Sequence, residues 1–404
     1  MKYLIVVPDG AADREIEALS GKTPLYAANM EYTNSLAACG EIGLVKTVPE
    51  GMSPGSDAAN MSVMGFDPSV FLTGRAPLEA VSIGISMTDT DVAFRTNLIT
   101  LEGGGAFEDT AIKDHSSGDI PTEEADELIQ TANREFADDK MRFYTGVSYR
   151  HCLIVKDGDT RYEMTPPHDV LGKRAGDCLP KGRGSEFITD MMKRSYEIFK
   201  GHPVNVSRIK RGLNPASSLW IWGQGKKPAL SSFYEKYGIK GSVISAVDLI
   251  KGIGICAGLD PVGVAGATGT IDTNYEGKAG AAIDEFKKGR DFVYLHVEAP
   301  DECSHHGDLA GKIESLKRID ERVVKPVVEY LKAGTDRFRV MILPDHMTPL
   351  ALRTHTGEPV PFVIYDSSCV AEYDKSRAFT EESGADGKFY DSGFSLADYF
   401  FRQI

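Results

Sequence analysis

Carboxylate side chains follow three short apolar segments of the chain, and a proline precedes each of them. The three residues are Asp9, after segment 4–8, Asp301, after segment 294–300, and Asp345, after segment 340–344. Proline has no backbone N–H, so it ends the hydrogen-bond ladder of a strand. In an open α/β sheet, ligands bind outside the carboxyl ends of the strands, so we expect these carboxylates to converge on one crevice.

Histidine is concentrated near two of these acids. Five of the nine histidines lie between residues 296 and 355, and they are His296, His305, His306, His346 and His355. Asp301 and His305 are four residues apart, so on a helix both side chains share one face, which suits two ligands of one divalent ion. His306 could replace His305 if the helix were rotated, although the spacing favours His305. For His296, inside a predicted strand, we favour a hydrogen-bonded core residue.

The residues after the third acid add further candidate ligands. His346 directly follows Asp345, and this adjacent carboxylate and imidazole can turn toward two neighbouring ions. His355 follows in the loop 354–358. Carboxylates and imidazoles without cysteine thiolates suit manganese, zinc, cobalt or magnesium better than copper or an iron–sulfur cluster. The pattern therefore predicts a centre for divalent metal ions.

Ser56 is the candidate nucleophile. It follows Pro54 and Gly55, which predict a tight turn, and a helical pattern begins at or just after it. The hydroxyl would then lie among the free N–H groups of a helix N-terminus, which stabilise a phosphate group. Taken alone, the motif favours a helix N-cap. The set of acids and histidines favours a nucleophile instead, because a metal ion lowers the pKa of a coordinated hydroxyl.

Motifs along the whole chain resemble those of the archaeal-type cofactor-independent phosphoglycerate mutases, members of the alkaline phosphatase superfamily. In chain order they are VVPDG, PGSDAANMSVMGFDP, TGRAPLEA, SYRH, HDVLGK, NPASSLWIWGQG, APDECSHHGD, LPDH and THTGEPVPF. The resemblance implies two divalent metal ions, with manganese as the first choice. The ligands that it implies for one ion are Asp9, Ser56, Asp345 and His346. Those that it implies for the other ion are Asp301, His305 and His355. Pro300 and Ser304 depart from the family's usual Thr and Gly, but neither change removes a ligand.

The resemblance also implies a reaction. Ser56 would take the phosphoryl group from 3-phosphoglycerate, and the phosphoserine would return it to the other hydroxyl of the reoriented glycerate to give 2-phosphoglycerate, a step of glycolysis and gluconeogenesis. Two cations and a guanidinium can neutralise the charge on the transferring group. Water must be excluded, because it would hydrolyse the phosphoserine, and a closing lid domain would serve this purpose.

Six residues are candidates for binding the substrate, namely Arg150, His168, Asp169, Arg75, Lys251 and Arg95. The first three lie in the middle of the chain, and arginine suits carboxylate and phosphate groups because it binds them with two hydrogen bonds. Arg75 and Lys251 lie near turn signals and could hold the transferring phosphate, with a solvated surface charge as the open alternative. Arg95 lies in a predicted strand whose side chains alternate between apolar and polar. The open alternative is that Arg95 belongs to the face of this strand that is exposed to water.

The elements that position these residues predict an α/β fold. Short apolar segments predict buried strands of a mainly parallel sheet over 3–7, 243–245, 292–297, 338–343 and 362–365. Apolar residues at helical spacing predict a helix over 309–332 that ends before Gly334. Together with the resemblance, they predict an alkaline-phosphatase-like sheet sandwiched by helices.

The middle of the chain has a different pattern. It predicts strands over 92–101, 142–145 and 148–155 and helices over 123–136 and 184–199. We therefore expect residues 89–212 to form a smaller inserted α+β domain, the substrate-binding lid. Residues 1–88 and 213–404 would together form the discontinuous metal-binding catalytic domain.

The net charge excludes some classes of partner. The chain has 45 Lys and Arg against 59 Asp and Glu, a net charge of −14, which disfavours nucleic acid and membrane surfaces. Residues 140–213 have 15 Lys and Arg against 8 Asp and Glu, as expected of a lid that receives a small phosphorylated acid. The six cysteines are scattered without a CxxC pair, and no apolar run approaches the roughly 18 residues of a membrane span, so we expect a reduced, cytoplasmic protein.

Two alternative functions stay open at this point. The same metal ligands would serve another phosphoryl-transfer enzyme of the superfamily: a phosphatase, a phosphopentomutase-like enzyme or a homoserine kinase. The discriminating residues should lie around 140–213. A non-catalytic, metal-stabilised binding protein is the second alternative, and the presence of Ser56 beside a complete ligand set argues against it.

Overall fold

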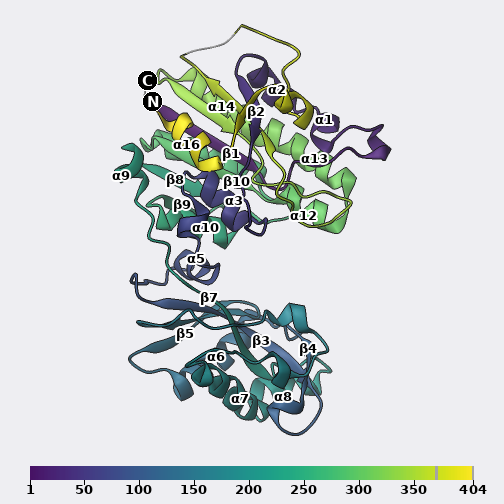
Figure 1. Ribbon diagram of the computed structural model, residues 1–404, viewed down its shortest axis with the longest axis vertical. Helices are drawn as coiled ribbons and strands as arrows, with labels where there is room; N and C mark the ends of the chain where they lie inside the picture. The colour runs from purple at the N-terminus through teal and green to yellow at the C-terminus, as the bar shows by residue number, and fades with distance from the viewer. Residues whose placement is uncertain (369–371, 403–404) are drawn as a thin grey trace. The chain divides into compact units, whose positions relative to one another are not determined.

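The computed structural model describes residues 1–368 and 372–402 (Figure 1). The chain forms two compact units, one of Met1–Leu72 with Ala229–Ile404 and one of Thr73–Pro228. The observed boundaries between the units, 72/73 and 228/229, differ from the boundaries 88/89 and 212/213 that the sequence pattern predicts. The reason is that α5 (Ala76–Ser82) packs on β3 (Val92–Glu102), and β7 (Ser218–Lys226) pairs with β3, so both elements belong to the second unit.

The first unit is built on an eight-stranded, mainly parallel sheet in the order β13-β2-β12-β11-β1-β10-β8-β9. Its strands are β1 (Lys2–Pro8), β2 (Glu41–Val45), β8 (Gly241–Ile244), β9 (Asp260–Val262), β10 (Phe292–Val297), β11 (Phe338–Ile342), β12 (Val360–Asp366) and β13 (Lys388–Tyr390). The strands from β11 to β9 in this order are parallel, whereas β12 is antiparallel to both of its neighbours. The five predicted strands are all present, and the predicted α/β class is confirmed.

Helices cover both faces of this sheet (Figure 1). They are α1 (Pro24–Ala28), α2 (Glu31–Ala38), α3 (Ser56–Val63), α4 (Pro68–Phe71), α9 (Phe233–Tyr237), α10 (Asp248–Cys256), α11 (Tyr275–Lys287), α12 (Ala299–His306), α13 (Leu309–Ile319), α14 (Lys325–Ala333), α15 (Glu381–Ala385) and α16 (Gly393–Phe401). On β10, Phe292 packs on Phe401 of α16, and the Tyr294 hydroxyl donates to Asn60 of α3. Because side chains alternate along a strand, Val293 and Leu295 face the opposite helical layer, which explains why every residue of β10 is buried.

The helix that periodicity predicts over 309–332 contains one irregular turn. Between α13 and α14, residues Asp320–Val324 form a π-helical turn. Pro326 lacks a backbone N–H, and in a regular α-helix its ring clashes with the carbonyl four residues earlier, so the wider turn relieves that clash. The spacing of apolar residues does not reveal the turn, because Val323, Val324 and Val327 all remain buried.

The second unit contains an antiparallel sheet with helices packed on it. Its strands are β3, β4 (Ala111–Asp114), β5 (Met141–Val147), β6 (Arg150–Val155) and β7, and its helices are α5, α6 (Thr122–Phe136), α7 (Glu186–Lys200) and α8 (Pro203–Lys210). The core of this unit includes Phe94, Leu128, Phe143, Ile188 and Trp220. Short 3-10 turns occur at Glu17–Leu19 in the first unit and at Phe107–Asp109, Pro167–Val170 and Ala175–Cys178 in the second.

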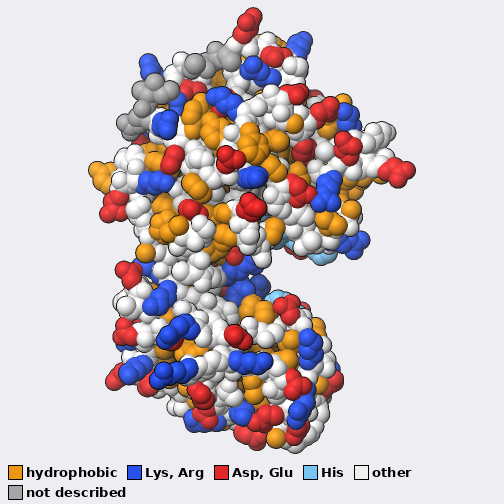
Figure 2. All heavy atoms as spheres, in the orientation of Figure 1, with side chains coloured by type: hydrophobic (Ala, Val, Ile, Leu, Met, Phe, Trp, Pro, Cys, Tyr) orange, Lys and Arg blue, Asp and Glu red, His pale blue; other side chains and the backbone are white. Residues whose placement is uncertain are grey.

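The charge of the second unit is more even than residues 140–213 alone indicate. Residues 73–228 contain 21 Lys and Arg against 23 Asp and Glu, because residues 73–139 are acidic. Figure 2 shows both signs interspersed on the visible surface of each unit. The second unit is therefore not uniformly basic, and a binding site for an anion in it must depend on particular side chains.

Within the described residues, no helix is both long enough and apolar enough to cross a lipid bilayer. Cys39, Cys152, Cys178 and Cys303 are free thiols in the described structure. Cys369 lies outside the described residues.

Candidate active site

The carboxyl ends of three neighbouring strands bring the candidate acids together. β1 lies between β10 and β11 in parallel pairing, so the loops that follow these strands leave the same edge of the sheet. Donor atoms of Asp9, Asp345 and His346 lie within 4.8 Å of one another, and so do donor atoms of Asp301, His346 and His355. The three acids therefore lie at one site, with His346 common to both groups.

One group of donor atoms surrounds Nε2 of His346. Ser56 Oγ is 3.1 Å from this nitrogen, Asp345 Oδ2 is 3.4 Å away and Asp9 Oδ1 is 3.6 Å away. Asp9, Asp345 and His346 are buried, whereas Ser56 is partly exposed. The structure thus brings together the four residues that the family resemblance assigns to one ion.

The second group forms around Asp301. Its Oδ2 is 3.1 Å from His305 Nε2, and its Oδ1 is 3.4 Å from His355 Nε2. The two histidine Nε2 atoms are 3.0 Å apart. His306 lies elsewhere, because its ring faces Glu302 and its side chain is 70% exposed. The structure therefore places His305, and not His306, among the candidate ligands.

The two departures from the family motif leave α12 intact. Pro300 lies in the first turn of the helix, where its missing N–H has no helical partner to lose. Ser304 is buried, and its hydroxyl donates to the carbonyl oxygen of Pro300 at 2.7 Å. Asp301 and His305 consequently remain one turn apart on the same face.

Burial dominates the electrostatics of this centre. Burial, followed by the charge of Asp345, raises the pKa of Asp9 well above its ordinary value. Burial also opposes ionisation of Asp301, yet hydrogen bonds with His305 and His355 outweigh it and hold the pKa of Asp301 below its usual range. In return, the hydrogen bond to Asp301 raises the pKa of His305 to about 9. The buried carboxylates therefore require positive charge beside them.

The donor set fits divalent metal ions. Asp9 Oδ1 is buried and has no hydrogen-bond partner, an arrangement that is costly unless another group uses the oxygen. The two groups of donors combine carboxylate oxygens with imidazole nitrogens, which suits manganese, zinc, cobalt or magnesium. Two groups within one site fit two ions better than one.

Ser56 is the first residue of α3 and does not cap it. The N-cap is Gly55, and no side chain caps the helix, so the hydroxyl of Ser56 is not used to satisfy a backbone N–H of the first turn. It faces His346 instead. The N-cap interpretation of the motif is therefore wrong for this serine.

Two further residues support the centre, although no motif argument singled them out. Asn60, one helical turn after Ser56, donates from Nδ2 to Asp345 Oδ2 at 2.8 Å and to the Ser56 carbonyl oxygen at 2.9 Å. Thr348 donates from Oγ1 to Asp301 Oδ1 at 2.6 Å. The four-residue spacing from Ser56 could have indicated Asn60, whereas the role of Thr348 depends on a loop conformation that spacing does not predict.

Aromatic rings surround His168 in the second unit. The ring centroid of His168 is 5.4 Å from that of Trp222 and 6.0 Å from that of His115, which also contacts Tyr149. Asp169 Oδ1 lies 3.7 Å from His168 Nε2, and both side chains are about half exposed. Burial lowers the pKa of His168, which favours the neutral form of its ring.

The two arginines of this unit differ in their partners. The guanidinium of Arg150 lies 5.3 Å from the ring centroid of Tyr149 and is exposed. Arg95 lies 4.8 Å from the Trp222 ring, and its Nε donates to Glu79 Oε2 at 2.9 Å within a two-point ion pair. The charge of Arg95 is therefore already compensated, whereas Arg150 presents its charge to solvent.

The remaining two candidates lie in different units. Arg75 directly precedes α5, and its charge contributes to the lowered pKa of His168, which places it near that ring. Lys251 lies on α10 in the first unit, where its Nζ is 2.7 Å from Asp248 Oδ1. Five of the six candidates thus belong to the second unit and one to the first.

Known proteins match nearly the whole chain. The 2,3-bisphosphoglycerate-independent phosphoglycerate mutase of Methanosarcina acetivorans is 48% identical over 388 residues, which cover 96% of each chain. A mutase of the same description from Methanothermobacter thermautotrophicus, numbered 2, is 43% identical over 396 residues, 96% of this chain and 94% of its own. The chain belongs to this family.

Further comparisons agree with this membership. A family model described as 2,3-bisphosphoglycerate-independent phosphoglycerate mutase matches residues 37–205. The solved cofactor-independent phosphoglycerate mutase of Thermoplasma acidophilum is 27% identical, with a TM-score of 0.70 over 99% of each chain. A solved protein of Pyrococcus horikoshii, also 27% identical, has a TM-score of 0.82 over 100% of this chain and 98% of its own. The fold of this mutase family therefore extends over both units.

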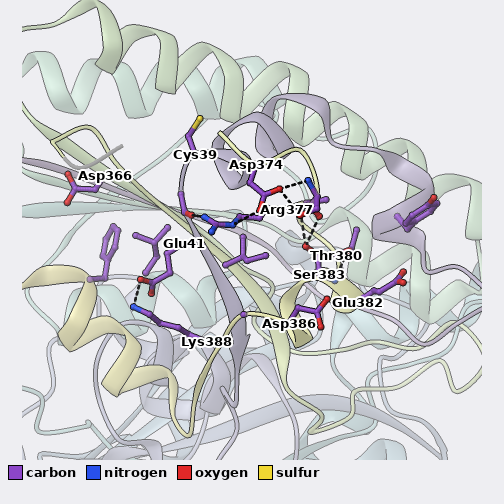
Figure 3. A pocket seen from close by; sticks show the side chains of 18 of the residues that line it. Cys39, Glu41, Asp366, Asp374, Arg377, Thr380, Glu382, Ser383, Asp386 and Lys388 are labelled. Carbon is purple, nitrogen blue, oxygen red and sulfur yellow. Dashed lines mark hydrogen bonds and ion pairs between the residues drawn. The ribbon is translucent and has the colours of Figure 1, made fainter. Parts of the chain in front are cut away.

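A cavity of about 1060 Å³ lies in the first unit, lined by other residues than those of the strand-end centre (Figure 3). Parts of β2, α15 and the segment 374–388 form its wall, and none of the candidate site residues lines it. Several charges in its wall are paired with each other, as in Lys388 with Glu41 and Arg377 with Asp374. No histidine is among the residues that line this cavity, and both candidate groups of metal donors found in the described residues lie at the strand ends, so the candidate active site is the centre there.

Proposed function

We propose that this chain interconverts 3-phosphoglycerate and 2-phosphoglycerate through a phosphoserine at Ser56, without 2,3-bisphosphoglycerate. The observation that carries the proposal is the position of Ser56, whose hydroxyl lies 3.1 Å from His346 beside buried carboxylates. Its support is the family membership, because the relatives that match nearly the full length are phosphoglycerate mutases by description.

Two divalent ions are part of the proposal. Asp9, Ser56, Asp345 and His346 would hold one ion, and Asp301, His305 and His355 the other. When bound, such ions neutralise charge on a phosphoryl group and lower the pKa of a nearby hydroxyl. Manganese is the first candidate for both sites, with zinc, cobalt or magnesium as alternatives that the donor atoms also suit.

The protein's own groups then account for the transfer. Ser56 Oγ loses its proton and forms a bond to phosphorus, while the bond from phosphorus to the C3 oxygen of the substrate breaks and that oxygen takes up a proton. In the second half, the C2 oxygen of the reoriented glycerate loses its proton and forms the bond to phosphorus, while the bond from phosphorus to Ser56 Oγ breaks and Oγ takes up a proton. Because Ser56 begins α3, the N–H groups at the N-terminus of that helix favour the negative charge of the phosphoryl group.

Residues of the second unit are proposed to bind the glycerate part. Arg150 has an exposed guanidinium suited to a carboxylate, and His168 with Asp169 offers neutral and acidic groups suited to hydroxyls. Arg75 and Lys251 are proposed phosphate contacts. Arg95 is proposed to hold Trp222 in place, since its charge is paired with Glu79. The role of residues 73–228 as a lid that excludes water belongs to the same proposal.

The test uses the full chain, 3-phosphoglycerate and Mn²⁺, with no 2,3-bisphosphoglycerate. We expect 2-phosphoglycerate to appear by ³¹P NMR. If only inorganic phosphate appears, the chain is a phosphatase and the mutase proposal is wrong. Phosphopentomutase and ATP-dependent homoserine kinase assays on the same preparation test the other enzymes of the superfamily.

The nucleophile is tested by Ser56→Ala, which should abolish turnover by removing the oxygen that accepts phosphorus. The matched control is Ser53→Ala, which changes an exposed serine in the loop before α3 and should leave turnover unchanged. Unchanged turnover in Ser56→Ala would contradict the phosphoserine assignment.

A further inference from the structure

His296 lies in the middle of a buried hydrogen-bond chain that ends on Asp9. Its ring is fully buried on β10, its Nε2 is 2.8 Å from Asp9 Oδ2, and its Nδ1 is 3.2 Å from Ser245 Oγ. The hydroxyl oxygen of Ser245 in turn accepts from the backbone N–H of Val247 at 2.9 Å. Lys278 Nζ donates to the His296 carbonyl oxygen at 3.0 Å, which anchors this part of β10 to α11.

The direction of these hydrogen bonds follows from Asp9 at one end of the chain, because an ionised carboxylate only accepts. Because Ser245 Oγ already accepts from Val247 N–H, its own hydroxyl hydrogen is available for His296 Nδ1. A neutral imidazole has one donor and one acceptor nitrogen, so accepting at Nδ1 places the ring hydrogen on Nε2. Nε2–H then donates to Asp9 Oδ2. The opposite tautomer would set a nitrogen lone pair against a carboxylate oxygen.

In this arrangement the two carboxylate oxygens of Asp9 have different surroundings. Oδ2 is held by His296, whereas Oδ1 is buried, has no hydrogen-bond partner and lies in the group of donors around His346. A carboxylate that is free to rotate would exchange the two oxygens. With one oxygen held by a donor on the sheet, the other stays directed at the group of donors around His346.

We propose that His296, oriented by Ser245, is a positioning residue that holds Asp9 with Oδ1 directed at one divalent metal ion. The proposal rests on the metal centre of the proposed function. His296 acts only through Asp9 and touches neither ion nor substrate. Groups that orient a metal ligand from behind commonly change metal affinity by about 10–100-fold when they are removed.

The test compares two amide replacements of His296 in the full chain. Glutamine places its amide nitrogen near the position of Nε2, whereas the amide nitrogen of asparagine reaches only the position of Nδ1. We expect His296→Gln to keep Mn²⁺ affinity within about 3-fold of the original chain, and His296→Asn to lose about 10–100-fold, by calorimetric titration of metal-free protein. Excess Mn²⁺ should restore turnover in His296→Asn, which a general loss of structure would not allow.

A second pair of variants keeps the inference testable if His296→Asn does not fold. Ser245→Ala removes the hydroxyl that fixes the ring tautomer, and we expect a measurable loss of Mn²⁺ affinity. Ser242→Ala is the control: it is a buried serine on β8 that bonds to Glu285 instead, and it should bind Mn²⁺ as the original chain does.

The outcomes separate this inference from the proposed function. If His296→Asn and Ser245→Ala both bind Mn²⁺ as tightly as the original chain, the positioning role is overturned while the metal centre stands. If both lose affinity and Ser242→Ala does not, the role is supported. If the original chain itself takes up no divalent ion, the metal centre fails and the positioning role with it.

Discussion

Replacement of Lys312 by methionine should destabilise the protein strongly, because this lysine connects two loops of the active centre from inside the fold. Its ammonium group is completely buried on α13, 2.8 Å from Asp13 Oδ2 and 3.0 Å from the Thr348 carbonyl oxygen. Asp13 Oδ2 also accepts from the N–H of Leu350 at 3.1 Å. Lys312 thus joins the loop after β1 to the loop after β11.

The magnitude follows from what the substitution leaves behind. Methionine fills most of the volume of the lysine stem, so packing changes little. The carboxylate of Asp13, which is 3% exposed, would lose its only cationic partner among the described ion pairs. Breaking a buried ion pair from one side costs about 3–5 kcal/mol, a large part of the roughly 5–15 kcal/mol by which a typical domain is stable.

Urea unfolding followed by circular dichroism measures this loss. Lys317→Met on the same helix is the control: Lys317 is exposed, so its free energy of unfolding should change by less than about 0.5 kcal/mol. The double variant Lys312→Met with Asp13→Asn should recover part of the loss, since the buried charge is then removed. A loss below about 1 kcal/mol in Lys312→Met would refute the reasoning, because it would mean that the buried Asp13 carboxylate does not depend on Lys312 for its stability in the folded protein.

Three further predictions concern pH, substrate and metal. Burial lowers the pKa of Lys278 to about 8, so the folded chain binds this proton less tightly than the unfolded chain. Between pH 8 and about 10.5 the free energy of unfolding of the original chain should therefore rise relative to that of Lys278→Met, by up to about 3 kcal/mol in urea unfolding. The control Lys287→Met keeps Lys278 and should show the same rise as the original chain. Arg150→Met should raise KM for 3-phosphoglycerate by about 10–100-fold with a smaller effect on kcat, since a charge-assisted hydrogen bond contributes about 1.5–3 kcal/mol; an unchanged KM in steady-state kinetics would contradict its role in binding. Chelation with EDTA should abolish turnover and lower Tm, and adding back Mn²⁺ should restore both; activity that persists in metal-free protein would contradict the two-ion centre.

Spacing along the chain predicted the parts of the site that lie within single elements. Asp301 and His305 share a helix, so their four-residue spacing is enough to define their common face. The strand-end acids follow from the rule that parallel strands open at one edge, and β10, β1 and β11 are indeed neighbours. The division between the units could not be placed in this way, because β7 belongs to the second unit through its pairing with β3, a contact between segments more than 100 residues apart.

The residues that hydrogen-bond to the candidate metal ligands could not be predicted from the sequence for the same reason: their contacts join distant segments of the chain. His296 faces Asp9 because parallel pairing of β1 with β10 aligns Val7 with His296, and no pattern within either strand encodes that register. The favoured interpretation of His296 as a hydrogen-bonded core residue fits its burial but says nothing about its partner. Burial lowers the pKa of this histidine to about 3, so it donates to Asp9 as a neutral ring.

Each carboxylate of the centre has a neutral side-chain donor from another segment, in addition to the contacts of Asp301 with His305 and His355. The pairs are Asp9 with His296, Asp345 with Asn60, and Asp301 with Thr348. Neutral donors orient a carboxylate without compensating its charge, unlike lysine or arginine. The buried lysines nearby, Lys278 and Lys312, donate to backbone carbonyls and to Asp13, and they form no ion pair with these three acids. The neighbouring side chains therefore leave part of the negative charge of these buried carboxylates uncompensated. Divalent cations can neutralise this charge, because each brings two positive charges into a small volume.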